Sequence, residues 1–246
     1  MSDALVIIPT YNELENISRI VNAVFAKRPS FHVLVVDDNS PDGTAALVTK
    51  LQQRYEHQLF MLNRKEKKGL GVAYIAGFKW ALERSYDFIF EMDADYSHDP
   101  NDLIKLYNTC KEDGYDVAVG SRYVKGVNVV NWPLGRVLLS YFASMYVRFI
   151  TGLPVKDATA GFICYKREVL EAINFEKIQF VGYAFQVELK FKAWLKGFKI
   201  KEVSVIFTNR AYGKSKMNTS IFSEAIFGIM TMKLRSIFNR KQYEQK

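Results

Sequence analysis

Cysteine and histidine are scarce in this chain. Of its 246 residues, two are cysteines and three are histidines. Cys110 and Cys164 lie far apart in apolar or helical contexts, so neither a zinc-binding motif nor a disulfide framework is indicated. His32 falls in a strand-like run and His57 in a loop, which leaves little material for histidine-centred acid–base chemistry. The low cysteine content fits a reducing cytoplasm.

Long apolar runs are missing as well. No uncharged apolar stretch approaches the ~20 residues that a membrane-spanning helix requires. The first residues turn polar before a signal peptide could form, and Asp3 stands where such a peptide carries basic residues. We therefore expect a cytoplasmic protein whose contact with a membrane, if any, is peripheral.

The chain is rich in apolar residues and carries an excess of basic ones. Hydrophobic residues make up 49% of the 246 residues, which suffices for one sizeable core, so one large domain or one domain with a tail is expected. Lys and Arg number 34 against 26 Asp and Glu. This surplus favours phosphate-bearing partners or an anionic membrane surface.

The order of strand-like and helix-like segments predicts an α/β fold. The strand-like apolar runs are "ALVIIP", "FHVLVVDD", "QLFMLNR", "DFIFEMDAD" and "DVAVGSR". Between the first two, apolar residues recur on one helical face from Leu14 to Phe25, and Asn12 with Glu15 resembles a capping box. The alternation predicts a mostly parallel, Rossmann-like sheet flanked by helices. Polar loops that follow such strands meet at one edge of the sheet, where ligands bind.

An acidic cluster, "FEMDADYSHDP", follows the fourth strand-like run. Asp93 and Asp95 flank the small Ala94, so their backbone positions point to the same side of an extended chain. Carboxylate oxygens suit Mg²⁺ or Mn²⁺, and one or two are enough when a diphosphate fills the other positions. A capped turn is the plain alternative, with Asp99 as the cap of the next helix. The residues alone leave both interpretations open.

Further polar residues stand at predicted strand ends and in loops. Asp38 ends the second strand-like run and is suited to accept hydrogen bonds from a nucleobase or ribose. Arg136 and Ser140 fall on one face if their segment is helical, and with Arg122 they form a plausible phosphate clamp. The glycine-containing loop "NRAYGKSK" brings Arg210 and Lys216, which could fold over a diphosphate. Each of these arginines and lysines, judged singly, could equally be a solvated surface residue.

Taken in order, these segments resemble one family. The matching segments are "IIPTYNE", "VVDDNSPDGT", "KKGLGVAYIAGF", "EMDADYSHDP", "GSRY", "DATAGF", "GYAFQVE" and "NRAYGKSK". They resemble the dolichol-phosphate mannose synthases, also called polyprenol monophosphomannose synthases, which are inverting glycosyltransferases. The resemblance extends from Leu5 to about Lys216. It departs at Tyr96, where members of the family usually carry Leu, and in "DATAGF", where "DPTSGF" is commoner.

The resemblance implies a fold, a reaction and a set of roles. It implies a glycosyltransferase-A fold over residues 1–216, an amphipathic and basic tail over 217–246, and transfer of mannose from GDP-mannose to a polyprenyl phosphate with Mg²⁺ or Mn²⁺. The residues that would hold the nucleoside are Pro9, Tyr11, Glu13, Val36 and Asp38. Those that would meet the ribose, diphosphate and metal are Asp93, Ala94, Asp95, the main metal ligand, and Ser97 as a less secure ligand. The acceptor phosphate would be held by Arg122, Arg136 and Ser140. The donor diphosphate would be covered by Arg210 and Lys216.

The implied reaction explains why histidine is dispensable. A phosphate monoester has its second pKa near ~6, so the acceptor is largely a dianion at neutral pH and can attack without a protein base. Asp95 and Arg122 are then the main catalytic candidates, and a single displacement would give a β-linked product. His98 is the histidine that stands closest to the acidic cluster.

The lipid acceptor suggests a role for two apolar segments. Residues 137–150 and the tail could form amphipathic helices at a membrane surface, with basic residues facing an anionic leaflet. Packing on the core or in an oligomer interface is the alternative.

Three rival functions remain. A transferase that uses UDP-glucose or UDP-N-acetylglucosamine differs in contacts that a single sequence does not display. A catalytically silent nucleotide- or lipid-phosphate-binding module is argued against by the intact acids and arginines. Nucleic acid is a poor partner because the expected crevice is acidic rather than basic.

Overall fold

The protein is described by a computed structural model that covers residues 2–28, 30–182, 184–209 and 220–238. The predicted ligands Arg210 and Lys216 lie outside these ranges, so their roles stay predictions.

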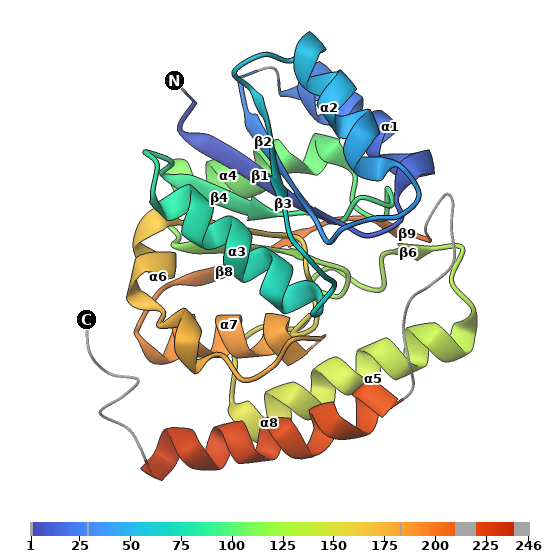
Figure 1. The fold of residues 1–246 in the computed structure, drawn as a ribbon. Coiled ribbons are helices and arrows are strands. Elements are labelled where there is room, and N and C mark those ends of the chain that lie inside the picture. The colour runs from blue at the N-terminus through green and yellow to red at the C-terminus, as the bar shows by residue number, and fades with distance from the viewer. Residues whose placement is uncertain (1, 29, 183, 210–219, 239–246) are drawn as a thin grey trace.

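A central sheet organises the described residues (Figure 1). Its strand order is β3-β2-β1-β4-β7-β5-β8. The strands are β1 (Ala4–Thr10), β2 (His32–Asp37), β3 (Leu59–Asn63), β4 (Phe88–Glu91), β5 (Val117–Ser121), β7 (Ile163–Lys166) and β8 (Ile200–Ser204). All five strands expected in the first half are present, and the sheet is parallel except that β7 runs antiparallel to β4 and β5. The mostly parallel α/β sheet is therefore confirmed.

Helices cover both faces because alternate residues of each strand point to opposite sides. Leu5 and Ile7 of β1 pack in a core shared with the third and seventh helices, whereas Val6 and Ile8 pack with the first and fourth. The helices on these faces are α1 (Leu14–Lys27), α2 (Thr44–Arg54), α3 (Leu70–Leu82), α4 (Leu103–Lys111), α6 (Arg167–Ala172) and α7 (Ala184–Leu195). Two 3-10 turns, η1 (Pro100–Asp102) and η2 (Phe175–Lys177), join them.

Two long helices, α5 (Leu134–Thr151) and α8 (Ser220–Phe238), lie side by side below α7 in Figure 1. Ile229 and Met232 of α8 are buried, and Lys233 Nζ donates to the Thr151 carbonyl at 3.0 Å. A short two-stranded sheet, β6 (Val129–Val130) and β9 (Phe207–Thr208), lies near the N-terminal end of α5.

The outer face of this helix pair is apolar and exposed. Its exposed side chains include Leu134, Leu138, Leu139, Tyr141, Phe142, Met145, Phe149, Phe227, Met230, Leu234, Ile237 and Phe238. One side of each helix therefore packs on the protein, whereas the contact of the exposed side with a membrane stays a prediction. Among the described helices, none is both long and apolar enough to cross a bilayer.

Candidate active site

The loops that follow β1 and β2 form one hydrogen-bonded unit. Thr10 Oγ1 donates to Asp37 Oδ2 at 2.7 Å, and the Ser40 amide donates to the other oxygen of that carboxylate at 2.9 Å. The Asn12 amide in turn donates to Ser40 Oγ at 3.0 Å. The expected meeting of "PTYNE" and "DDNSPDGT" at the carboxyl edge of the sheet is therefore confirmed.

Helix α1 begins without the predicted capping box. Asn12 has a left-handed backbone (φ 54°), and the residue at the cap, Glu13, makes no side-chain capping hydrogen bond. The start of the helix is instead capped from the neighbouring loop, because Asp42 Oδ2 accepts from the Leu14 amide at 3.1 Å and Thr44 Oγ1 accepts from the Glu13 amide at 3.0 Å. Asp42 is thus a structural cap that fixes one loop against the other.

The residues predicted to hold a nucleoside lie along this edge and differ in their burial and contacts. Asp38 is buried and pairs with Arg64 at 2.7 Å, while Lys67 Nζ lies 4.3 Å from the centre of the Tyr11 ring. Burial raises the pKa of Asp38, although Arg64 opposes the shift. Pro9 and Glu13 are half-buried beside them. The side chain of Val36 lies fully inside the core, so any contact with a nucleoside would have to come from its backbone.

A tight turn carries the predicted metal ligands directly after β4. Asp95 is 8% exposed and its Oδ1 accepts from the Ser97 amide at 3.1 Å. Asp93 is half-buried, and its Oδ1 accepts a long hydrogen bond of 3.4 Å from the Tyr74 hydroxyl. Ala94 between them is buried. Asp99 lies outside this set and caps η1 by accepting from the Asn101 amide at 2.9 Å, as predicted.

The turn fits a divalent ion that shares its coordination with a substrate. The hydroxyl of Ser97 is buried, and within the described residues it has no hydrogen-bond partner. A buried polar atom without a partner is costly unless a ligand satisfies it. In the described ranges, no group of three or more His, Cys, Asp or Glu side chains that could hold a metal comes together. Two carboxylates and a hydroxyl are a suitable set for Mg²⁺ or Mn²⁺ when phosphate oxygens and water complete the shell.

His98 supports the turn and is unsuited to proton transfer. Its ring is 3% exposed and stacks on Phe162 with the ring centres 4.8 Å apart. The Asp93 amide donates to Nδ1 at 3.2 Å, which requires that this nitrogen carry no proton. Burial lowers the pKa of His98 to about 4, against an opposing effect of Asp95, so the ring is neutral at neutral pH.

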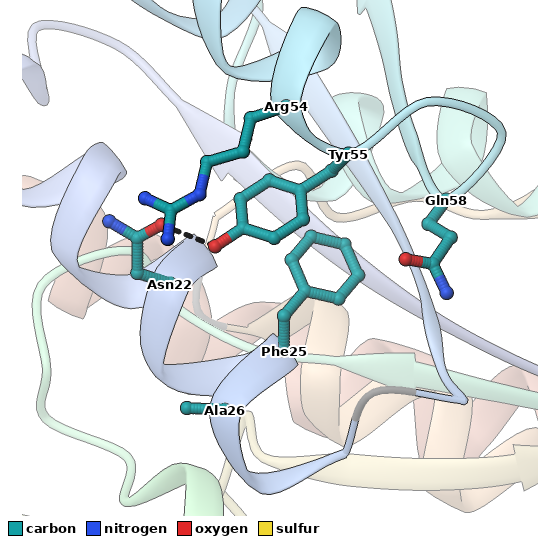
Figure 2. Close-up of a pocket in the computed structure, with 6 residues that line it drawn as sticks. All are labelled: Asn22, Phe25, Ala26, Arg54, Tyr55 and Gln58. Carbon is teal, nitrogen blue, oxygen red and sulfur yellow. Dashed lines mark hydrogen bonds between the residues drawn. The ribbon is translucent and has the colours of Figure 1, made fainter.

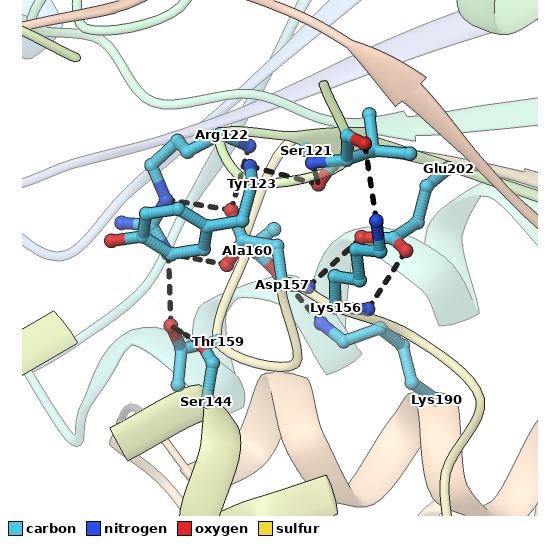
Figure 3. A network of polar contacts seen from close by, with 11 residues as sticks. Ser121, Arg122, Tyr123, Ser144, Lys156, Asp157, Thr159, Ala160, Lys190 and Glu202 are labelled. Carbon is cyan, nitrogen blue, oxygen red and sulfur yellow. Dashed lines mark hydrogen bonds and ion pairs between the residues drawn. The ribbon is translucent and has the colours of Figure 1, made fainter. Parts of the chain in front are cut away.

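Arg122 is held by a buried carboxylate (Figure 3). Its Nε donates to Asp157 Oδ2 at 2.7 Å, its Nη2 donates to Oδ1 at 2.5 Å, and its backbone amide also donates to Oδ2 at 2.8 Å. Nη2 donates further to Thr159 Oγ1 at 2.8 Å. The structure thus gives Arg122 a protein partner that the sequence did not suggest, and its role toward an acceptor phosphate stays a prediction.

The loop that carries Asp157 is fixed from several sides (Figure 3). Glu202 of β8 accepts from the Lys156 and Asp157 amides at 2.7 and 2.9 Å. Lys190 of α7 is fully buried and donates to the Ala160 carbonyl at 2.6 Å. Burial lowers the pKa of Lys190 to about 8. These contacts hold the Arg122 guanidinium at a defined place beside the sheet edge.

Arg136 and Ser140 both lie on α5, as predicted. The Arg136 guanidinium carbon is 4.0 Å from the centre of the Trp132 ring, and its Nη1 donates to Asn209 Oδ1 at 2.9 Å. The same Trp132 ring lies 5.6 Å from the Arg122 guanidinium carbon, so both arginines border one aromatic side chain. Ser140 lies beside the Tyr123 phenol, whose pKa is raised by burial and lowered in part by this hydroxyl. The three predicted acceptor residues therefore gather around one aromatic patch.

A shallow hollow elsewhere, between α1 and α2, is a weaker candidate (Figure 2). Tyr55 stacks on Phe25 with ring centres 4.3 Å apart, and its hydroxyl donates to Asn22 at 2.6 Å. None of the predicted site residues lines the hollow.

Some residues of the site could not be predicted from the sequence. Arg64 and Asp157 pair with predicted residues that are distant in sequence, and Lys190 and Glu202 fix the loop behind Arg122. "DATAGF" is one of the segments that match the family, but the sequence alone indicates no role for its aspartate, Asp157. The available signal was that an arginine placed directly after a buried strand needs a counter-charge.

Comparison with known proteins identifies a matching family model and similar sequences. The family model "Glycosyl transferase family 2" matches residues 5–173. A polyprenol monophosphomannose synthase from Mycolicibacterium smegmatis is 46% identical over 236 residues, which cover 96% of this chain and 89% of that protein.

Solved structures share the fold. Glucosyl-3-phosphoglycerate synthase from Mycobacterium tuberculosis, solved with Mn²⁺, UDP and glucosyl-3-phosphoglycerate, aligns with a TM-score of 0.68 at 16% identity, over 95% of this chain and 78% of that one. A mannosyltransferase from Pyrobaculum calidifontis, solved with GDP-Man and Mn²⁺, aligns with a TM-score of 0.61 at 15% identity, over 98% and 72%. At such low identity these likenesses concern the fold alone, and they confirm the glycosyltransferase-A class expected from the sequence.

Proposed function

The chain belongs to glycosyl transferase family 2, and we propose that it transfers mannose from GDP-mannose to a polyprenyl monophosphate with inversion at the anomeric carbon. The name of the Mycolicibacterium relative supports the sugar and the type of acceptor. The GDP-Man and Mn²⁺ in the Pyrobaculum neighbour support the donor and the metal at the level of a shared fold.

One observation carries the acceptor assignment. Arg136 and Ser140 lie on α5, the helix that also presents much of the exposed apolar face. A polyprenyl phosphate combines an anionic head with a long apolar chain, and one helix here offers a suitable surface to each.

The acceptor would provide its own nucleophile. At neutral pH a phosphate monoester is largely a dianion, so no protein base is needed for attack on the anomeric carbon. His98 is neutral and hydrogen-bonded to the backbone, which is consistent with such a mechanism. The task of the protein is then to align two anionic substrates and to offset their repulsion. Arg122, Arg136 and Ser140 are proposed to hold the acceptor phosphate in line with the sugar.

The donor would lie across the edge formed by β2, β1 and β4. We assign the nucleoside to Tyr11, Glu13, Asp38 and the backbone near Pro9 and Val36. Asp93, Asp95 and Ser97 would hold Mg²⁺ or Mn²⁺, which when bound supplies positive charge to the departing diphosphate. Arg210 and Lys216, outside the described residues, remain candidates for covering that diphosphate.

The lipid acceptor also implies a location. We propose that the outer face of α5 and α8 lies on the cytoplasmic surface of a membrane. Both helices carry basic residues there, Arg148 and Arg235 among them, and each such residue near an anionic leaflet contributes about 1 kcal/mol. The apolar side chains would enter the acyl boundary, as in other interfacial helices.

A donor panel tests the proposal. Purified protein is incubated with polyprenyl phosphate, Mg²⁺ or Mn²⁺, and radiolabelled GDP-mannose, UDP-glucose or UDP-N-acetylglucosamine, and the organic phase is counted. GDP-mannose should label the lipid and both UDP-sugars should not. Label from a UDP-sugar instead would favour the rival transferases, and binding of nucleotide without label from any donor would favour a silent binding module.

A further inference from the structure

Tyr96 stands in a backbone conformation that its side chain disfavours. Its φ is 63°, in the left-handed region, where residues with a Cβ meet steric conflict and glycine or asparagine is more usual. Strained residues of this kind persist where the surrounding structure fixes them, and they gather at functional sites. Tyr96 lies between Asp95 and Ser97, two of the proposed metal ligands.

The side chain of Tyr96 is anchored to another element. Its hydroxyl donates to the carbonyl of Arg19 in α1 at 2.7 Å, and its half-buried ring packs against the core beneath that helix. Helix α1 is the element that begins at the nucleoside loop, where Asp42 and Thr44 cap its first residues. A single tyrosine thus connects the turn after β4 to the helix that leads out of the loop after β1.

The anchor bears directly on the turn geometry. The Ser97 amide donates to Asp95 Oδ1, so Tyr96 is the central residue of a closed turn and its backbone decides where both neighbours point. Fixing the ring on α1 holds this residue in the left-handed conformation. Without the anchor, the turn could relax to a less strained backbone and the Asp95 carboxylate and Ser97 hydroxyl would move apart.

We propose that Tyr96 is a positioning residue that couples the metal turn to the nucleotide loop through α1, so that metal and nucleoside diphosphate strengthen each other's binding. This inference rests on the proposed metal-dependent use of GDP-mannose. It concerns the binding of the metal and the nucleoside diphosphate, and it does not depend on the identity of the acceptor.

The test measures coupling rather than turnover. GDP binding is followed by isothermal titration calorimetry with and without Mn²⁺, in the wild type and in Tyr96→Phe, which keeps the ring and loses the anchor. The ratio of the GDP affinity with Mn²⁺ to the GDP affinity without it should fall about fivefold in Tyr96→Phe, which corresponds to the free energy of one lost hydrogen bond. The GDP affinity without metal should stay unchanged. Tyr107→Phe is the control, because it also loses a hydrogen bond of a tyrosine hydroxyl, to Asp3 at 2.7 Å, but on α4.

A second variant, Tyr96→Asn, also tests the role of the anchor. Tyr96→Asn adopts the left-handed backbone readily but cannot reach α1, so it tests the connection to α1 apart from the backbone conformation, and it should lose the coupling as Tyr96→Phe does. Wild-type coupling in Tyr96→Phe or in Tyr96→Asn, or equal loss in Tyr107→Phe, would overturn the inference. If the wild type itself bound GDP without any effect of Mn²⁺, the proposed donor chemistry would fail instead, which separates the two ideas.

Discussion

Asp95 and Asp99 stand four residues apart in one turn and differ in their surroundings. Asp95 is buried beside the Ser97 hydroxyl, which has no hydrogen-bond partner in the described part of the chain, whereas Asp99 is exposed and caps η1. Asp95→Asn should reduce metal-dependent transfer by at least about 100-fold, since changes to outer-shell partners alone cost 10- to 100-fold. Asp99→Asn should keep its activity, because Asn caps helices about as well as Asp. Transfer assays with a thermal melt of each variant check this, and full activity of Asp95→Asn would remove the metal assignment.

The Arg122–Asp157 pair predicts a large stability effect. Asp157 is fully buried, so Asp157→Asn leaves the Arg122 charge without its counter-charge and should lower the free energy of unfolding by about 3–5 kcal/mol. Glu171→Gln is the control, because the exposed pair of Glu171 with Arg167 should be worth about 1 kcal/mol or less. Urea unfolding measures both. Similar decreases in the free energy of unfolding in the two variants would show that the buried pair contributes no more to stability than the exposed one.

At the residue scale, polar residues at strand ends could be predicted from the sequence, but their hydrogen-bond and ion-pair partners could not. Asp93, Asp95 and Asp99 could be placed because short spacing after a strand determines their position. The pairing of Arg122 with Asp157 could not, because 35 residues separate the two and local spacing holds no information about such contacts. The capping of α1 by Asp42 was missed for the same reason.

At the element scale, the attachment of α8 depends on a glycine. A Cβ on Gly228 would lie 2.4 Å from the Phe180 ring, whereas a Cβ on Gly135 of α5 would meet nothing within 4 Å. Gly228→Ala should therefore destabilise the protein by about 1–3 kcal/mol through overpacking. Gly135→Ala should be neutral or stabilising by up to about 1 kcal/mol, because alanine favours helices. Denaturant titrations compare the pair, and the docking of α8 would be in doubt if both changes were equally harmless.

The outer face of the helix pair predicts membrane binding. Phe149 and Phe238 are 86% and 83% exposed, so changing both to Ser should alter the free energy of unfolding by no more than about 0.5 kcal/mol each. Binding to anionic vesicles should weaken at least tenfold, because a buried Phe contributes about 1.5–3 kcal/mol. Leu14→Ser is the control, an exposed apolar residue on α1, which lies far from α5 and α8 in Figure 1. Unchanged vesicle co-sedimentation of the double variant would point to another use of this face.

Helices and strands with a clear apolar pattern could be predicted from the sequence, but the elements against which they pack could not. The apolar runs that form β1 to β5 and the helical face of α1 can be recognised in the sequence, and the structure confirms these elements. The antiparallel insertion of β7 and the pairing of α5 with α8 depend on contacts between distant segments. The sequence therefore left open whether the apolar helices pack on the protein or face a membrane.

At the scale of the whole molecule, the polar edge of the sheet and the apolar helix pair are joined by the loop around Asp157. This loop contacts Arg122, the residue directly after β5, Glu202 of β8, and α5 through the contact of Thr159 with Ser144 at 3.3 Å. The sheet class and the identity of most site residues could be anticipated from motifs. The joint arrangement of donor edge, arginines and apolar face required the folded chain.

We propose a single inverting displacement by a lipid phosphate. It can be tested by NMR analysis of the lipid product formed from GDP-[1-¹³C]mannose and polyprenyl phosphate in the presence of Mn²⁺. We expect mannose joined through its anomeric carbon to the polyprenyl phosphate in the β configuration. An α-linked product, or mannose that remains entirely in the aqueous phase, would contradict it.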